Sequence, residues 1–136
     1  IILWRSIYET NGRFYVDAIR PTLWPTTYTG TSVRKLNTSK DFPWLNRETT
    51  QAEDIKRFRK LSQDYVAKFR DDSERVIDVR YAFIPTEIAA LWSIRLSKIA
   101  DPHDHAIYET DRSKAQKQLP KLIRMIFGRP VKSLAE

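Results

Sequence analysis

Two runs of aromatic and β-branched residues open the chain, residues 3–8 and residues 13–19. Side chains of these types are typical of strands. Asn11-Gly12 lies between the runs and supplies the two positive-φ positions that a type I′ turn requires. The pattern therefore predicts a β-hairpin at the start of the chain.

Prolines interrupt regular structure after this hairpin. Pro21 and Pro25 each lack the backbone N–H that a helix or a strand ladder would use. Residues 26–36, rich in Thr and Tyr, then predict a third strand. Gly30 lies inside this strand, and an interior glycine is typical of a bulge.

The clearest helical pattern covers residues 50–69. Its apolar side chains recur every three or four residues and predict one buried face: Ile55, Phe58, Leu61, Tyr65, Val66 and Phe69. The opposite face is polar and mainly basic: Lys56, Arg59, Lys60, Gln63 and Lys68. Thr50 and Glu53 have the spacing of a capping box, so we expect the helix to begin there. We expect it to end near residues 71–73.

The second half of the chain predicts shorter elements. Residues 75–83 and 91–97 predict strands, and residues 106–110 predict a short last strand. Helical spacing returns over residues 111–127, at Leu119, Leu122, Ile123 and Ile126. Pro120 falls within this stretch, so the helix is either kinked at Pro120 or begins there.

This order of elements predicts an α+β fold. We expect a mainly antiparallel sheet with one long helix packed on it and a C-terminal helix, because the first strands form a hairpin and several links are too short for parallel crossovers. At 136 residues, the chain is expected to form one domain, residues 1–136, around one core.

Composition narrows the range of partners. The net charge is +7 and the pI is about 9.8, a balance that favours nucleic acid, phospholipid headgroups or a phosphorylated substrate. A basic surface that serves only solubility is the alternative. The chain has no Cys, which excludes disulfides and thiolate chemistry. It also lacks an apolar run of about 20 residues, so we expect a soluble piece, and its start at Ile1 suggests a fragment of a longer protein.

Several segments together resemble a known family. They are the pattern D-x-R-Y followed by P-x-x-I-x-x-L-W-x-I in residues 78–94, the upstream LWRSIYE and GRFYVDAIR, and DFPWL before the helix. This combination, over roughly residues 3–96, resembles the soluble C-terminal region of the YdjM-type membrane-bound metal-dependent hydrolases.

The resemblance implies a function for the parent protein. It implies an enzyme of the bacterial inner membrane whose metal-binding and catalytic residues lie in an N-terminal, membrane-embedded part. No residue of this chain matches that motif, so the chain is expected to hold no catalytic residue and no cofactor, while a divalent metal belongs to the full-length protein. The transmembrane part of the same protein or an anionic membrane surface is the expected partner.

Asp78 and Arg80 are the first candidate site. Their spacing of two places them on one face of a strand, with Tyr81 on the other. They could orient or clamp an anionic substrate, or they could form a structural ion pair. Charged pairs with this spacing are common on solvated strands, so we favour the structural role.

His103 and His105 are weak candidates for a metal site. They flank Asp104, with Asp101 close by, and imidazole with carboxylate can hold a divalent cation. A complete site would have to recruit ligands from elsewhere. We therefore favour an ordinary solvated loop.

Exposed aromatic and basic residues are the remaining candidates. Trp24 and Trp44 lie beside prolines in loops and are the best candidates for exposed contact, whereas we expect Trp4 and Trp92 to be buried. The densest basic stretch is expected to contact an anionic partner through Arg112, Lys114, Lys117, Lys121 and Arg124. The alternative is the solvated face of a packed helix.

Two functional hypotheses remain. The first is an accessory domain that covers or positions a membrane-embedded hydrolase site and contacts an anionic substrate or lipid headgroups. The second is a basic nucleic-acid-binding module, which is less favoured because no RNP, helix-turn-helix or zinc-finger pattern is present. A self-sufficient enzyme is least favoured, since the chain has neither G-x-S-x-G nor a Gly-rich phosphate loop.

Overall fold

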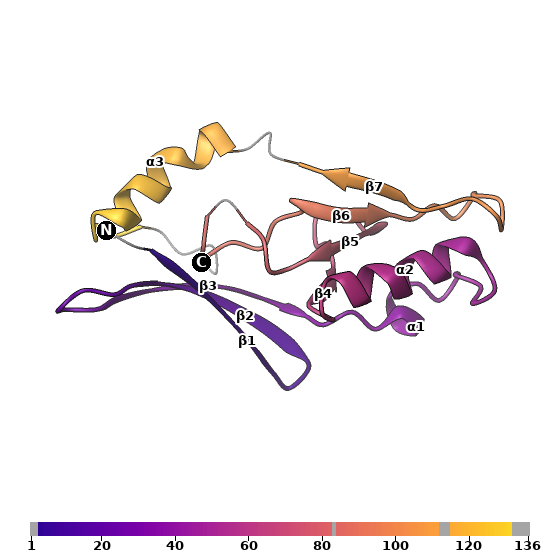
Figure 1. Cartoon of the computed structure of the whole chain (residues 1–136), viewed down its shortest axis with the longest axis horizontal. Helices are drawn as coiled ribbons and strands as arrows, with labels where there is room; N and C mark the ends of the chain where they lie inside the picture. Colours follow the sequence, from indigo (N-terminus) through magenta and orange to yellow (C-terminus); the bar gives the residue numbers. More distant parts are fainter. Residues whose placement is uncertain (1–2, 83, 112–114, 132–136) are drawn as a thin grey trace.

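The computed structural model describes residues 3–82, 84–111 and 115–131. Two antiparallel sheets make up most of it (Figure 1). The first sheet has the order β1 (Trp4–Thr10), β2 (Arg13–Arg20), β3 (Thr26–Arg34). The second has the order β4 (Val66–Lys68), β5 (Arg75–Asp78), β6 (Trp92–Arg95), β7 (Ile107–Thr110). The helices are α1 (Thr38–Asp41), α2 (Thr50–Leu61) and α3 (Ala115–Ile126).

The predicted N-terminal hairpin is present. Asn11 and Gly12 have φ values of 51° and 72°, as a type I′ turn requires, and β1 pairs with β2 from Trp4 to Thr10. The pairing of β2 with β3 shifts register between Tyr15 and Asp17, which places a bulge near Gly30. A Cβ on Gly30 would lie 2.0 Å from the carbonyl oxygen of Val16 and 2.5 Å from that of Thr86, so only glycine fits there.

The prediction of a single sheet with one long helix is wrong. The fold is mainly β, and the second sheet lies between α2 on one face and the first sheet on the other. On β5, Val76 belongs to the cluster beneath α2, whereas Ile77 packs with Phe14 of the first sheet. Burial on both faces explains why the adjacent residues Val76 and Ile77 are both apolar and fully buried.

Helix α2 ends eight residues earlier than the periodicity predicts. Gln63 and Asp64 have φ values of 51° and 63°, which a continuing α-helix cannot accommodate. The Asp64 carboxylate holds this turn, since it accepts from Arg59 Nε at 2.7 Å and lies 3.0 Å from Lys35 Nζ. The chain then enters β4, which pairs with β5, so the expected helical residues 65–69 are extended instead.

The start of α2 also differs from the prediction. Thr49 is the N-cap, and its side chain accepts from the backbone N–H of Ala52. Glu53 forms an ion pair with Lys56, 2.6 Å away, instead of closing a capping box with Thr50. The cap is therefore one residue earlier than the sequence pattern indicates.

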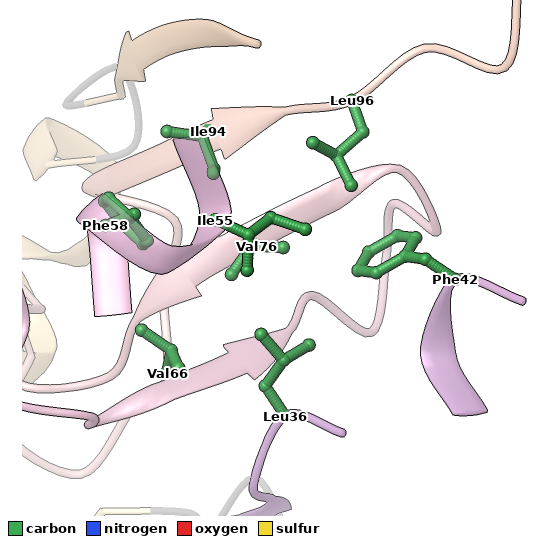
Figure 2. Packing of buried hydrophobic residues seen from close by; sticks show 8 residues of the cluster. All are labelled: Leu36, Phe42, Ile55, Phe58, Val66, Val76, Ile94 and Leu96. Atoms are coloured by element: carbon green, nitrogen blue, oxygen red, sulfur yellow. The ribbon is translucent and has the colours of Figure 1, made fainter. Parts of the chain in front are cut away.

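The core under α2 confirms part of the predicted helix face. Ile55 and Phe58 point onto the second sheet, where they pack with residues of β4, β5 and β6 (Figure 2). The cluster comprises Leu36, Phe42, Ile55, Phe58, Val66, Val76, Ile94 and Leu96. Leu61, also expected in this face, is the last residue of α2 and is 76% exposed, so it does not belong to the buried face.

Arg5 of β1 ties the first sheet to the loop that follows β5. Its guanidinium donates to four backbone oxygens of that loop: Val79 (2.7 Å), Ile84 (3.4 Å), Pro85 (2.6 Å) and Glu87 (2.7 Å). Burial lowers the pKa of Arg5 to about 10, and the charge of Glu87 opposes this shift. The loop thus depends on one cation from a distant strand.

Phe58→Ala and Leu61→Ala form a matched pair that tests the observed helix face. Phe58 is 6% exposed, so its truncation should cost about 3–5 kcal/mol of unfolding free energy. Leu61→Ala should change it by less than about 0.5 kcal/mol. Urea unfolding measures both, and similar losses for the two variants would contradict the assigned face.

Arg5→Gln should destabilise the fold by about 3 kcal/mol, because several charge-assisted hydrogen bonds to buried carbonyl oxygens are lost together. Arg5→Lys should recover little of this, since an ammonium cannot span four acceptors as a guanidinium does. Urea unfolding gives the comparison, with the exposed Arg47→Gln as control. Full stability of Arg5→Lys would show that charge alone holds the loop.

Acidification should weaken the second sheet through Glu109. Hydrogen bonds from Arg95 and Arg75 lower the pKa of Glu109 below its ordinary 4.5. The carboxylate therefore contributes stability above pH 4.5, and this contribution is lost as the pH falls through the lowered pKa.

Unfolding free energies measured across this range should show a shallower acid loss for Glu109→Gln than for the wild type. Glu48→Gln, at an exposed position, is the control and should leave the slope unchanged. Identical acid slopes for Glu109→Gln and the wild type would rule out this carboxylate as a source of the pH dependence.

Candidate functional site

Helix α3 is held on the inner face of the first sheet by one buried side. Met125 is fully buried against Ala18, Tyr28 and Ile84, and Leu122 packs at the edge of the same cluster. Backbone oxygens at its C-terminal end accept from that sheet: Ile126 O from Arg20 Nε (3.0 Å) and Arg129 O from Tyr28 Oη (3.0 Å). The helix therefore has a defined orientation.

Glu87 anchors the middle of α3. It comes from the loop that Arg5 holds, it is 8% exposed, and it lies 3.1 Å from Lys121 Nζ. Gln118 donates to the same carboxylate. Lys121, predicted to contact an anionic partner, is thus engaged within the protein and is only half-exposed.

An apolar stripe runs along the outward side of α3. Leu119, Ile123 and Phe127 follow one another at intervals of four and are 45%, 43% and 60% exposed. Side chains with this spacing lie on one helix face. We call these three residues the α3 stripe.

Basic residues flank the α3 stripe. Lys117 and Arg124, both predicted contact residues, are exposed. On a helix of 100° per residue, Arg124 projects about 140° from Leu119 and lies nearer to Phe127 than to the buried Met125. Lys117 projects about 160° from Leu119, midway between Phe127 and Met125. Arg112 and Lys114, from the same prediction, lie outside the described residues. The outward surface of α3 therefore combines an apolar stripe with a basic edge.

A second group of exposed apolar side chains lies at the end of the molecule where α3 ends. Leu23 and Trp24 occupy the β2–β3 loop and are 95% and 86% exposed. This loop directly follows Arg20, which binds the last turn of α3, and Figure 1 shows the loop and that end of the helix at the same extremity. Trp24 therefore has the exposure that its position beside Pro25 predicts.

The other tryptophans have different environments. Trp44, also predicted to be exposed, is half-buried, in edge contact with Phe42 and with Lys98 Nζ 6.0 Å from its ring centroid. Trp92 is half-buried. Trp4 is 60% exposed, so the expectation that it is buried is wrong: it lies on the outer face of the first sheet.

Asp78 and Arg80 form a close ion pair. Asp78 is 3% exposed, and Arg80 Nη2 lies 2.7 Å from its Oδ2. The backbone N–H of Arg80 also donates to Asp78 Oδ1, and Nη2 donates to Leu61 O at the end of α2. The pair thus joins the end of β5 to the end of α2, which favours the structural interpretation.

The two histidines are exposed and not clustered with other ligands. His105 Nδ1 lies 3.0 Å from the Asp54 carboxylate, and the backbone N–H of His103 donates to Asp101. Within residues 3–82, 84–111 and 115–131, no group of three or more His, Cys, Asp or Glu side chains could hold a metal ion.

The sequence reasoning missed the apolar half of this surface. It used Leu119 and Ile123 only as evidence of helical spacing and did not consider Leu23 and Phe127 as exposed apolar residues. A signal was present, because Leu119, Leu122, Ile123, Ile126 and Phe127 together cover a wider arc than one buried face needs. The fully buried Met125 lies at one side of that arc, and Leu122 packs beside it, which leaves Leu119, Ile123 and Phe127 exposed.

Comparisons with protein-family models, with curated proteins and with solved structures yield no significant match. In the described part of the chain, no helix has the length and apolar character needed to cross a bilayer.

Proposed function

We propose that this chain is an accessory domain that rests on an anionic membrane surface. The observation that carries the proposal is the outward surface of α3, where Arg124 lies next to the α3 stripe and Lys117 lies farther round the same helix. Apolar residues next to cations match a bilayer interface, where acyl chains lie just beneath anionic headgroups. An ordinary solvated helix face has no need of three exposed large apolar side chains.

The anchoring of α3 supports a rigid contact. Arg20, Tyr28 and Glu87 hold the helix from three sides, so its outward surface is presented without rearrangement. Leu23 and Trp24 extend the contact at the same end, and a tryptophan is well suited to the headgroup level because its ring is amphipathic. Each Lys or Arg near an anionic surface contributes about 1 kcal/mol.

The wider role in this proposal follows the resemblance to the YdjM-type hydrolases. The domain sits against the membrane beside the transmembrane part of the same protein, and it covers or positions the membrane-embedded, metal-dependent site. In this proposal the transmembrane part carries out the chemistry, and this domain positions or covers its site. A bacterial inner membrane is the location that the same resemblance supports.

The domain should bind vesicles of phosphatidylglycerol and phosphatidylcholine more tightly than vesicles of phosphatidylcholine alone, and salt should weaken the binding. Lys117→Gln with Arg124→Gln should lower the affinity about 30-fold, since two cations each contribute about 1 kcal/mol. Ile123→Ser with Phe127→Ser should lower it at least about tenfold, because apolar burial is lost. Vesicle co-sedimentation measures all of these affinities.

Two matched controls accompany these variants. Arg47→Gln with Lys60→Gln removes the same charge from exposed positions elsewhere, and Ile99→Ser alters an isoleucine that is 96% exposed in another loop. Both should bind as the wild type does. Equal losses for the control and the α3 charge variants would mean that net charge, not this surface, drives binding, and the proposal would fail.

A further inference from the structure

The outer face of the first sheet carries a groove unrelated to α3. Its volume is about 920 Å³, and its walls come from β1, β2, β3 and the turn after β4. Strand alternation explains the composition, because β2 buries Phe14 and Val16 inward and so turns Arg13 and Tyr15 outward. The register places Tyr8, Tyr15 and Ser32 in one row across the three strands.

Positive charge in this groove is only partly compensated. Four cations line it, Arg13, Arg34, Lys68 and Arg70, against two carboxylates, Asp17 and Asp41. Asp41 forms an ion pair with Arg34, and Asp17 accepts from the backbone N–H of Gly30 at the bulge. Among the described residues, Arg13 and Arg70 have no carboxylate within ion-pair distance.

The two uncompensated guanidinium groups converge on Ser32. Arg13 Nη2 donates to Ser32 Oγ at 3.2 Å, and Arg70 Nη2 donates to Ser32 O at 3.4 Å. They arrive from β2 and from the turn after β4, so the site is assembled from separate parts of the chain. Guanidinium groups bind phosphate through paired N–H donors, and a serine hydroxyl can add a further donor.

A flat aromatic surface lies beside this basic pair. The rings of Tyr8 and Tyr15 are stacked, with centroids 5.3 Å apart and planes at 10°. Tyr8 is 47% exposed, although it lies in the centre of a strand. Tyr15 covers one face of the Tyr8 ring, and the exposed part of Tyr8 is available to a planar ring. Such stacking is largely independent of which base is bound.

We propose that this groove binds a ligand of the nucleotide class, with its phosphate between Arg13 and Arg70 and its ring on Tyr8. The groove is large enough for one nucleotide or a short strand. It lies on the face of the first sheet opposite to α3, since β2 turns Ala18 toward α3 and Arg13 and Tyr15 toward the groove. The inference therefore does not depend on the membrane contact, and the two can fail separately.

Calorimetric titration of the chain with adenosine monophosphate, adenosine, ribose 5-phosphate and a short single-stranded oligonucleotide tests the proposal. The monophosphate should bind more tightly than adenosine or ribose 5-phosphate. Arg70→Gln should weaken binding of the monophosphate at least about tenfold, as expected for loss of a charged phosphate contact. Tyr8→Ala should weaken the monophosphate but leave ribose 5-phosphate unchanged.

Arg47→Gln and Tyr108→Ala are the matched controls, because both residues are exposed away from the groove. Within the described part of the chain, the hydrogen bond of the Arg70 side chain is a long one to Ser32 O, so its variant should fold normally, and thermal unfolding verifies this. Affinity that rises with oligonucleotide length supports the proposal and identifies a strand as the source, whereas preference for the monophosphate identifies a free nucleotide.

Absence of saturable binding by the monophosphate and the oligonucleotide would overturn the proposal. So would binding that survives Arg70→Gln and Tyr8→Ala unchanged. If Arg70→Gln instead weakens only vesicle binding, the groove serves lipid headgroups and the nucleotide assignment is wrong.

Discussion

The contact of Arg5 with the loop after β5 is the interaction on which the rest of this structure depends. The loop has few regular hydrogen bonds of its own, and one guanidinium satisfies four of its backbone oxygens. Glu87 then extends from the same loop to Gln118 and Lys121 of α3. A cation on β1 thus contributes, together with Arg20 and Tyr28, to the position of the C-terminal helix, although Arg5 and α3 are more than a hundred residues apart.

Layering explains why the two proposed contact surfaces lie on different parts of the molecule. The second sheet is covered on both faces, by α2 and by the first sheet, so it offers little open surface. The first sheet keeps one open face, which carries the tyrosine pair and Arg13, and its inner face supports α3. We propose that one of these surfaces contacts a membrane and that the other holds an anionic ligand.

The errors of the sequence reasoning share one physical cause. Apolar periodicity indicates which side chains are buried, but it does not show which part of the fold they pack against. Residues 65–69 fit a helical period, yet Asp64 ends the helix through Arg59 and Lys35, and Val66 pairs with β5. The spacing of Leu119 and Ile123 predicts a helix but not which side of it is buried, and the fold buries Met125. Lys121 was predicted to contact an anionic partner, but it forms an ion pair with Glu87 of the same chain.

The sequence by itself determined the local elements: the Asn11-Gly12 hairpin, the bulge near Gly30, the buried positions Ile55 and Phe58, and the exposed Trp24. These follow from backbone conformation and short-range spacing, which neighbouring residues control. Only the tertiary structure decided the division into two sheets, the outward face of α3, and the meeting of Arg13 with Arg70 at Ser32. Each of these depends on contacts between residues far apart in the chain, which no local pattern records.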